Sequence, residues 1–285
     1  MKRYLFKIIF LMCTCLICPL SASAEADFKV QKTFKIDGAP LDIAVSERSY
    51  TMYVLTTDGI IYVYDFAGAL KGQIEVGKHI DGIAPGKSED TIFIKSKNEK
   101  TVQRIVIEFV HDIDIEGAPY KGRDDAPVVI TVFSDYQCPA CVRLSSKLDQ
   151  VIKGNKDNIK IVYKNYPLSM HKYARNAAAA ALTAHSMGKF REFHEALYAN
   201  SKQLDDNKVR EIAEGLELDP DEFIKQMRSQ KIQDKINKDM KDGKKAGLTQ
   251  TPSVYINGRL LKNTTTEGIQ GMINEQLKKL KQLKQ

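Results

Sequence analysis

The chain has 285 residues, of which 43% are hydrophobic and 28% charged, with a formal net charge of +7. This length and apolar content suffice for one large hydrophobic core or two ordinary ones, which excludes an intrinsically disordered protein. Much of the excess positive charge lies near the C-terminus, where the solvated face of a helix explains it, and no nucleic-acid-binding motif accompanies it, so we expect no nucleic acid partner. The lysines concerned are Lys278, Lys279, Lys281 and Lys284.

The first 24 residues have the pattern of a secretory signal peptide. Lys2, Arg3 and Lys7 flank an uncharged apolar run over residues 8–20, and the small residues 21–24 follow as a cleavage site. The run is shorter than the ~20 residues that cross a bilayer as a helix. We therefore expect cleavage after Ala24, a net charge of +4, and a soluble periplasmic protein. An uncleaved N-terminal anchor is the alternative.

The cysteines give the strongest chemical indication. Three of the five lie in residues 1–24, so the mature chain keeps only Cys138 and Cys141, separated by Pro139 and Ala140. A disulfide across two residues closes too small a loop to constrain the unfolded chain much, so a structural staple is disfavoured. The pair is expected to be redox-active.

A zinc half-site is the alternative for this pair. Structural zinc needs four ligands, and the sequence has neither a second CxxC nor a closely spaced pair of histidines. We expect no metal and no other cofactor. The five histidines are scattered over the chain at His79, His111, His171, His185 and His194.

Residues 25–110 are predicted to form a small all-β domain. They are rich in Val, Ile, Tyr and Phe and are interrupted by turn pairs such as Asp58-Gly59, which favours short antiparallel strands. Residues 42–44 and 52–54 recur weakly as residues 82–84 and 92–94, a period of forty that is typical of propeller blades.

Two blade-like units cannot close a ring, because propellers need at least ~4 blades. The open strand edges must be covered by the rest of the chain or by another subunit. This predicts a role for residues 25–110 in oligomerisation or partner binding. Chance similarity within an ordinary small sheet is the alternative.

Residues 111–126 are polar and contain Pro and Gly, as in a linker, and residues 127–285 follow as a second domain. Its predicted order is strand, CxxC helix, strand, helical block, strand pair and helix, which is an α/β sandwich with a helical insertion. A capping box of Thr264 and Glu267 is expected to start the last helix, which should end near Leu283. The predicted strands are 128–133, 159–163 and 254–256, and the predicted helical segments before the last are 173–200, 207–214, 219–227 and 231–241.

The CxxC spacing suits thiol–disulfide exchange. If a helix starts just after Cys138, Pro139 takes its first position at no cost, and the Cys138 sulfur faces the unpaired N–H groups and positive end of the helix. These groups stabilise a thiolate. Cys141, one turn further, should be buried and remain a thiol. Cys138 is thus the predicted nucleophile and Cys141 the resolving cysteine.

Three separate motifs stand out: FSDYQCPAC at 133–141, KNYPL at 164–168 with the alanine-rich and GKF/FHEALY segments after it, and TP at 251–252 followed by VYING. Together they resemble the DsbA-like family of the thioredoxin superfamily. The resemblance covers roughly residues 115–280 and leaves residues 25–110 outside. It implies a thioredoxin-like fold with a helical insertion, thiol:disulfide oxidoreductase activity on cysteines of exported proteins, and a possible membrane redox partner. It also implies a cis Thr251-Pro252 bond that pairs with a bound client peptide.

The sequence departs from that family where many members carry a buried glutamate, six residues before the first cysteine. Val132 stands there, so the proton-relay role of the glutamate is not carried over. Asp135 is expected to end the strand or cap the helix rather than act in catalysis. Lys164 is expected either near the site or in solvent. His171, His185 and His194 are expected to have packing roles, and the absence of histidine between the cysteines predicts a less strongly oxidising couple.

The favoured function is that of an oligomeric disulfide isomerase. Its basis is the unclosed repeat, together with Thr251 before Pro252, which by resemblance occurs in dimeric isomerase relatives. The alternatives are a monomeric disulfide oxidase or reductase, and an interaction protein in which the β-rich domain binds a partner under redox regulation.

Overall fold

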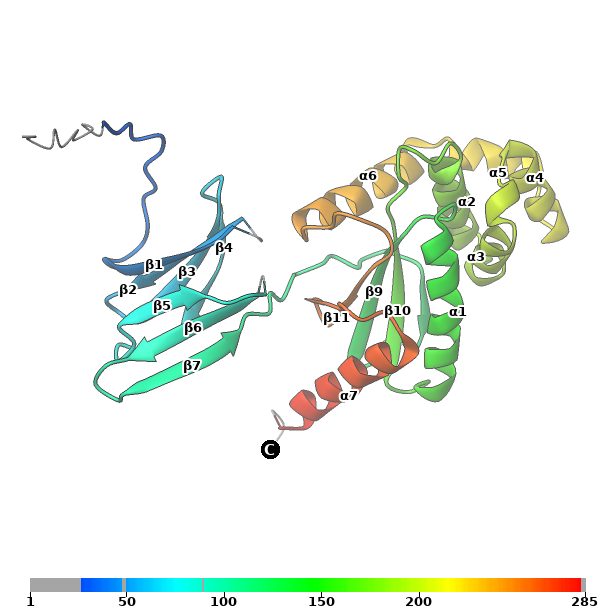
Figure 1. Cartoon of the computed structure of the whole chain (residues 1–285). Coiled ribbons are helices and arrows are strands. Elements are labelled where there is room, and N and C mark those ends of the chain that lie inside the picture. The colour runs from blue at the N-terminus through cyan, green and yellow to red at the C-terminus, as the bar shows by residue number, and fades with distance from the viewer. Residues whose placement is uncertain (1–26, 48–49, 89, 283–285) are drawn as a thin grey trace, which may run out of the picture.

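The computed structural model describes residues 27–47, 50–88 and 90–282, and these form two domains joined by an extended segment (Figure 1). The expected signal peptide, with its three cysteines, lies outside the described residues. Within the described part of the chain, no helix is both long enough and apolar enough to span a membrane.

The N-terminal domain consists of two antiparallel sheets, as the content of Val, Ile, Tyr and Phe and the turn pairs predict. The first sheet has the order β1-β2-β3-β4 and the second β5-β6-β7. Positions forty residues apart fall on equivalent strands, β1 with β5 and β2 with β6, so the weak repeat corresponds to two successive blade-like sheets. The strands are β1 (Pro40–Ser46), β2 (Thr51–Thr56), β3 (Ile60–Asp65), β4 (Leu70–Glu75), β5 (Gly82–Pro85), β6 (Thr91–Ser96) and β7 (Thr101–Val106).

The core of this domain lies between the two sheets. Leu55 and Ile61 from the first sheet and Ile92 from the second are fully buried in one cluster. The repeat positions also meet directly, because the carboxylate of Asp42 accepts a hydrogen bond from the Ile83 N–H at 2.8 Å. Burial of apolar side chains from both sheets therefore makes the two sheets one body.

The C-terminal domain is an α/β sheet with the strand order β12-β11-β9-β10-β8, in which only β9 and β10 are parallel. This is the predicted sheet with its helical insertion. The strands are β8 (Tyr120–Gly122), β9 (Val128–Ser134), β10 (Ile159–Asn165), β11 (Ser253–Ile256) and β12 (Arg259–Leu260). The helices are α1 (Pro139–Gly154), α2 (Ala174–Ser186), α3 (Phe190–Ala199), α4 (Asp206–Gly215), α5 (Pro220–Met227), α6 (Gln230–Lys245) and α7 (Thr266–Gln282), with a 3-10 turn at Ser201–Gln203.

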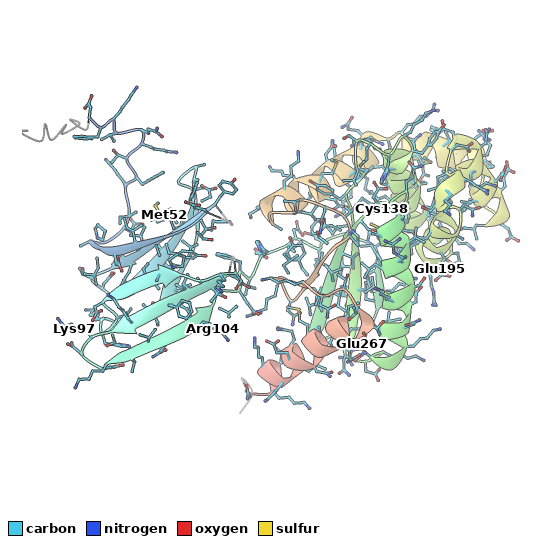
Figure 2. All side chains as sticks on the ribbon, viewed as in Figure 1. Met52, Lys97, Arg104, Cys138, Glu195 and Glu267 are labelled. Atoms are coloured by element: carbon cyan, nitrogen blue, oxygen red, sulfur yellow. The ribbon has the colours of Figure 1, made fainter. Side chains whose placement is uncertain are left out.

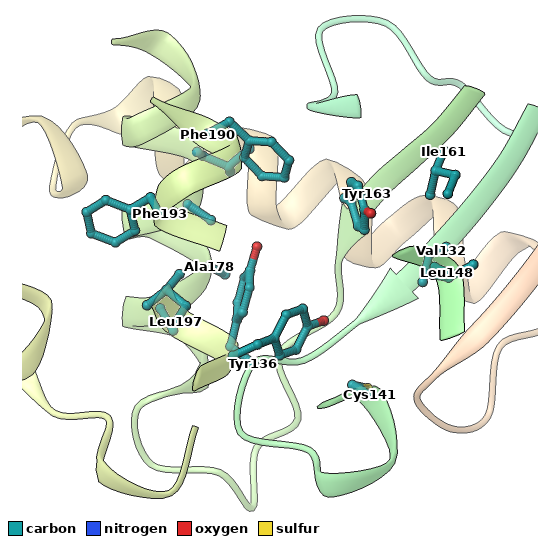
Figure 3. Close-up of a cluster of buried hydrophobic side chains, with 14 of the residues drawn as sticks. Val132, Tyr136, Cys141, Leu148, Ile161, Tyr163, Ala178, Phe190, Phe193 and Leu197 are labelled. Atoms are coloured by element: carbon teal, nitrogen blue, oxygen red, sulfur yellow. The ribbon is translucent and has the colours of Figure 1, made fainter. Parts of the chain in front are cut away.

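Both faces of the central strand β9 are covered. Val132 packs in the large core with α1, α7 and the helical insertion, whereas Phe133 points to the opposite face and packs with Ala246 and Tyr255. Successive side chains of a strand alternate between faces, so the uninterrupted apolar run of β9 fits a strand buried on both sides. Figure 3 shows part of the large core, where Phe190 of α3 points toward Tyr163 of β10, with ring centroids 5.6 Å apart.

Three local features differ from the sequence prediction. The segment 173–200 is two helices, not one, because the chain turns at Gly188 with φ +73°, a conformation that glycine adopts without strain. The last helix is capped by Thr265, whose hydroxyl accepts from the Gly268 N–H at 3.1 Å, so the capping box assigned to Thr264 is wrong. Strand β8 falls inside the expected linker 111–126 and pairs with β10.

The two domains also touch through a few polar contacts. Lys262, after β12, forms an ion pair with Asp90, and Arg259 lies 3.4 Å from the carboxylate of Glu108. The backbone of His111 donates to the Gly258 carbonyl at 2.8 Å. The β11–β12 hairpin is thus the part of the C-terminal domain that meets the N-terminal domain and its connecting segment.

Candidate active site

The loop between β9 and α1 places Cys138 at the N-terminus of α1 (Figure 2). Cys138 is the N-cap residue, with extended φ/ψ of −78° and 119°, and Pro139 occupies the first helical position. No side chain caps this helix end, and the N–H groups of Cys141 and Val142 donate to the Cys138 carbonyl at 3.0 and 3.2 Å. Cys138 therefore lies at the helix N-terminus, where the sequence predicts it, and the positive end of a helix dipole favours negative charge.

Cys138 lies beside the loop that precedes β11. Its Sγ is 3.6 Å from the carbonyl oxygen of Thr251, and the Thr251-Pro252 peptide bond is cis. The structure therefore brings together two sequence-predicted sites that are more than a hundred residues apart.

Cys141 lies one turn into α1, in the core, with only 1% of its surface exposed. Both cysteines are free thiols. Burial raises the pKa of the Cys141 thiol to about 12, against the opposing effect of hydrogen bonds from the Ser134 side chain and the Asp135 backbone. A neutral, buried Cys141 beside a Cys138 that faces a helix N-terminus is an arrangement for two-step disulfide exchange.

Residues 114–275 match the thioredoxin family model, which is more than half of the chain. The chain belongs to the thioredoxin family. Within that family its similarity is to DsbA-like proteins. The crystal structure of oxidised BdbD from Bacillus subtilis aligns with 26% identity and a TM-score of 0.54, over 60% of this chain and 98% of BdbD. The probable disulfide bond formation protein D of Bacillus cereus is 29% identical over 170 residues, 55% of this chain and 78% of that protein.

Two further similarities carry less information about function. The thiol-disulfide exchange protein α-DsbA2 from Wolbachia pipientis aligns with 23% identity and a TM-score of 0.51, over 56% of this chain and 87% of that one, which shows a shared fold. The Na(+)/H(+) antiporter NhaA 1 of Mycobacterium sp. strain KMS is 29% identical over 153 residues, 53% of this chain. The region that aligns with this chain is 25% of the length of that antiporter.

Asp135 holds the active-site loop of this thioredoxin-family domain. Its buried carboxylate accepts hydrogen bonds from the backbone N–H groups of Gln137 at 2.7 Å and Leu168 at 2.8 Å, and its Oδ2 lies 2.8 Å from His171 Nδ1. Asp135 thus ends the strand and fixes the loop, as expected, and the packing role expected of His171 includes this polar contact.

Val132 lies in the apolar core at 2% exposure, so no carboxylate occupies the position of the family's glutamate. The hydroxyl of Ser134 hydrogen-bonds Cys141 instead. Ser134 shares a hydrogen bond with the Tyr198 hydroxyl, and Tyr136 shares one with His194 Nδ1 at 2.8 Å. Burial, aided by the charge of Lys121, holds the pKa of His194 well below its usual range, so His194 is a neutral core residue.

Lys164 does not lie in solvent, so that expected placement was wrong, and its polar partners come from α6 and the segment before β8. It is fully buried, with its Nζ 2.9 Å from Asp239 Oδ1 and 2.8 Å from Asp242 Oδ2 of α6. The third group around it is the carbonyl of Asp114, at 2.7 Å. Asp239 and Asp242, three residues apart on one face of α6, were the sequence signal that a buried cation could pair with this helix.

The sequence reasoning also missed a groove next to the cysteines. It encloses about 450 Å³ between α1 and the chain around β11 and β12, and Thr251 and Pro252 form part of its wall. From α1 it is lined by residues at i, i+3, i+4 and i+7, the spacing of one helix face: Ala140, Arg143, Leu144 and Lys147.

Proposed function

We propose that this chain is a thiol:disulfide oxidoreductase acting on cysteines of exported proteins, with Cys138 as nucleophile and Cys141 as resolving cysteine. Thr251 and Pro252 bind the client backbone, and Pro139 and Ala140 complete the active-site motif. The observation that carries the proposal is the position of the Cys138 sulfur, at an uncapped helix N-terminus and 3.6 Å from the Thr251 carbonyl, with Cys141 buried one turn away.

The exchange proceeds in two balanced steps. The Cys138 thiolate attacks one sulfur of a client disulfide, and the other client sulfur leaves as a thiolate that takes up a proton. Cys141 then loses its proton and attacks Cys138 Sγ, which releases the second client thiol and leaves the Cys138–Cys141 disulfide. The client gains two electrons from the enzyme and two protons, one released by Cys141 and one taken from solvent. Run in reverse, the same steps oxidise a client dithiol.

Trapping of the intermediate tests this proposal. Cys141→Ala removes the resolving thiol, so mixed disulfides through Cys138 should accumulate, whereas Cys138→Ala should trap none. Non-reducing electrophoresis followed by peptide mapping gives the readout. Equal trapping by the two variants, or insulin reduction that survives Cys138→Ala, would refute these roles.

For the direction of the reaction, we propose net disulfide formation. The name of the Bacillus cereus relative, a probable disulfide bond formation protein, supports this direction. Turnover then needs a reoxidant for the reduced pair, for which a membrane redox partner is the proposed class. Equilibration with glutathione buffers measures the reduction potential. A value below about −250 mV, in the range of reducing thioredoxins, would contradict an oxidase.

An oligomeric isomerase is the second candidate, and the outer face of the first N-terminal sheet favours it. Leu41, Ile43 and Val45 of β1 project from this face with 47%, 55% and 41% of their surface exposed. Three apolar side chains in a row on an edge strand suit burial against a second copy. Two copies would present two redox pairs to one misfolded client, which isomerisation can use.

Export to the periplasm is part of the proposal and depends on residues 1–24. Their basic start, apolar run and small residues support recognition as a signal peptide cleaved after Ala24. N-terminal sequencing of the protein recovered from the periplasm would test it, with residue 25 as the expected first residue.

A further inference from the structure

The groove beside the cysteines has the chemistry of an anion-binding surface. Of the described residues that line it, three are cationic and none is acidic: Arg143, Lys147 and Lys262. Three of its lining residues are buried leucines, Leu144, Leu248 and Leu261, at 3%, 8% and 7% exposure. Cations beside buried apolar side chains suit an extended peptide that carries carboxylates.

The three cations are not equally available. Lys262 already pairs with Asp90 of the N-terminal domain. Lys147 donates to the Thr264 carbonyl at 3.1 Å and lies within electrostatic range of Glu267. Among the described residues, Arg143 has no hydrogen-bond or ion-pair partner in the structure and is exposed at the groove. Its five N–H donors, in a planar fork, are free to take a carboxylate with two parallel hydrogen bonds.

The position of Arg143 determines which residue of a bound client it can contact, counted from the client cysteine that reacts with Cys138. Arg143 lies five residues after Cys138, which along a helix is about 7.5 Å at ~1.5 Å per residue. An extended client advances ~3.3 Å per residue, so its second or third residue from the reacting cysteine comes level with Arg143. Lys147, about one helical turn further, comes level with the fourth residue.

We propose that this groove selects clients with acidic residues two to four positions from the reacting cysteine, and that Arg143 is the residue that determines this specificity. The inference rests on the proposed oxidoreductase function and adds to it a substrate class. Client binding then has two components: backbone pairing at Thr251, which is independent of sequence, and a charge-assisted hydrogen bond at Arg143, which depends on it.

The test uses the full-length protein with its Cys138–Cys141 disulfide as the oxidant and synthetic dithiol peptides as clients. The peptides differ only at the second and third residues from the cysteine, which are Glu in one, Gln in the second and Lys in the third. Single-turnover oxidation is followed by stopped flow. The wild-type rate constant should be about three- to tenfold higher for the Glu peptide than for the Gln peptide, and this ratio should fall in high salt.

Variants of Arg143 separate recognition of the client's charge from a general loss of activity at the redox site. Arg143→Gln should bring the Glu/Gln ratio to about one, and Arg143→Glu should invert the preference toward the Lys peptide. Arg191→Gln is the matched control, because Arg191 lies on α3 with its side chain 75% exposed and pairs with Glu195 outside the groove. It should keep the wild-type ratio. A ratio cancels any change in the intrinsic reactivity of Cys138, which a purely structural effect of Arg143 would alter equally for all peptides.

The outcomes distinguish this inference from the function on which it rests. If all peptides are oxidised at equal rates, or if Arg143→Gln keeps the preference, the groove does not read charge through Arg143 and the inference is wrong while the oxidoreductase function stands. If no peptide is oxidised at all, the proposed function itself fails.

Discussion

Asp135 and His171 are joined by a contact of 2.8 Å between a fully buried carboxylate and a mostly buried imidazole, 36 residues apart in the sequence. The same carboxylate accepts from the N–H groups of Gln137 and Leu168. One side chain therefore ties the loop that carries Cys138 to the segment after β10. The active-site loop owes its position to this carboxylate rather than to a helix cap on Cys138.

We expect Asp135→Ala to lower the free energy of unfolding by about 2–4 kcal/mol, because it leaves buried N–H donors without an acceptor. Urea denaturation followed by circular dichroism measures the change. Asp157→Ala, at an exposed aspartate in the same domain, is the control and should change stability by less than about 0.5 kcal/mol. Equal stabilities of the two variants would show that the Asp135 contacts contribute nothing net.

The buried pair of Lys164 and Asp239 predicts strong non-additivity. Lys164→Met should cost about 3–5 kcal/mol of stability, because Asp239 keeps its charge in the core without its main cation. The double variant Lys164→Met/Asp239→Leu should recover part of this loss, since both charges are then gone. Guanidinium denaturation of the four members of the cycle measures the coupling. A double variant less stable than Lys164→Met alone would contradict the pairing.

The raised pKa of Cys141 predicts selective alkylation of the reduced protein. A pH of 7–9 is well below the Cys141 pKa of about 12, so Cys141 is a protonated thiol, and it is also buried. Iodoacetamide should therefore label Cys138 and leave Cys141 unmodified. As the pH approaches 12 the protected fraction should fall. Mass spectrometry after tryptic digestion locates the label, and Cys138→Ala is the control that should remain unlabelled at pH 8. Rapid labelling of Cys141 at pH 8 would refute its protected state.

Ser134 donates a hydrogen bond that lowers the pKa of Cys141, so its removal should slow resolution. In Ser134→Ala the resolving thiolate is harder to form, and client release from the mixed disulfide should be about two- to tenfold slower, the equivalent of one neutral hydrogen bond. Stopped-flow release of a fluorescent peptide from the Cys138 mixed disulfide measures this step. Tyr198→Phe, which keeps Ser134, tests whether the neighbouring hydroxyl contributes. Unchanged release in Ser134→Ala would exclude this role.

The exposed strand β1 predicts self-association of the full chain. Ile43→Lys places a charge in the middle of the apolar row and should convert a dimer or larger oligomer to a monomer. Val102→Lys is a matched control on β7, where the side chain is 72% exposed and outside that row. Light scattering on a sizing column measures the mass. A monomeric wild-type protein would remove the oligomeric isomerase and leave the oxidase.

Local sequence patterns were sufficient to locate the reactive cysteines and their helix. Pro139 and the apolar run of 128–133 predict a strand, a turn and a helix start within a few residues, and these rest on short-range backbone chemistry. The strand-rich N-terminal domain was predictable for the same reason, since strand-forming residues and turn pairs are local signals.

The position of the cis-proline loop was predictable only by resemblance, because no local property of Thr251 and Pro252 points to Cys138. Their contact with Cys138 arises from the pairing of β11 with β9, which places the start of β11 beside the end of β9 and so beside the start of α1. The order of strands in the sheet therefore brings together residues that are more than a hundred positions apart in the sequence.

The sequence by itself determined the order of the elements that the proposed chemistry needs: an apolar strand, two cysteines and a proline at the helix start. Tertiary structure decided how the charged side chains are paired, because Lys164 is buried with Asp239, whereas Arg143 has no ion-pair or hydrogen-bond partner among the described residues. Helices and strands follow from the conformational preferences of neighbouring residues. The pairing of a charge depends on which distant side chain the fold brings within a few ångströms, and no local pattern contains that information.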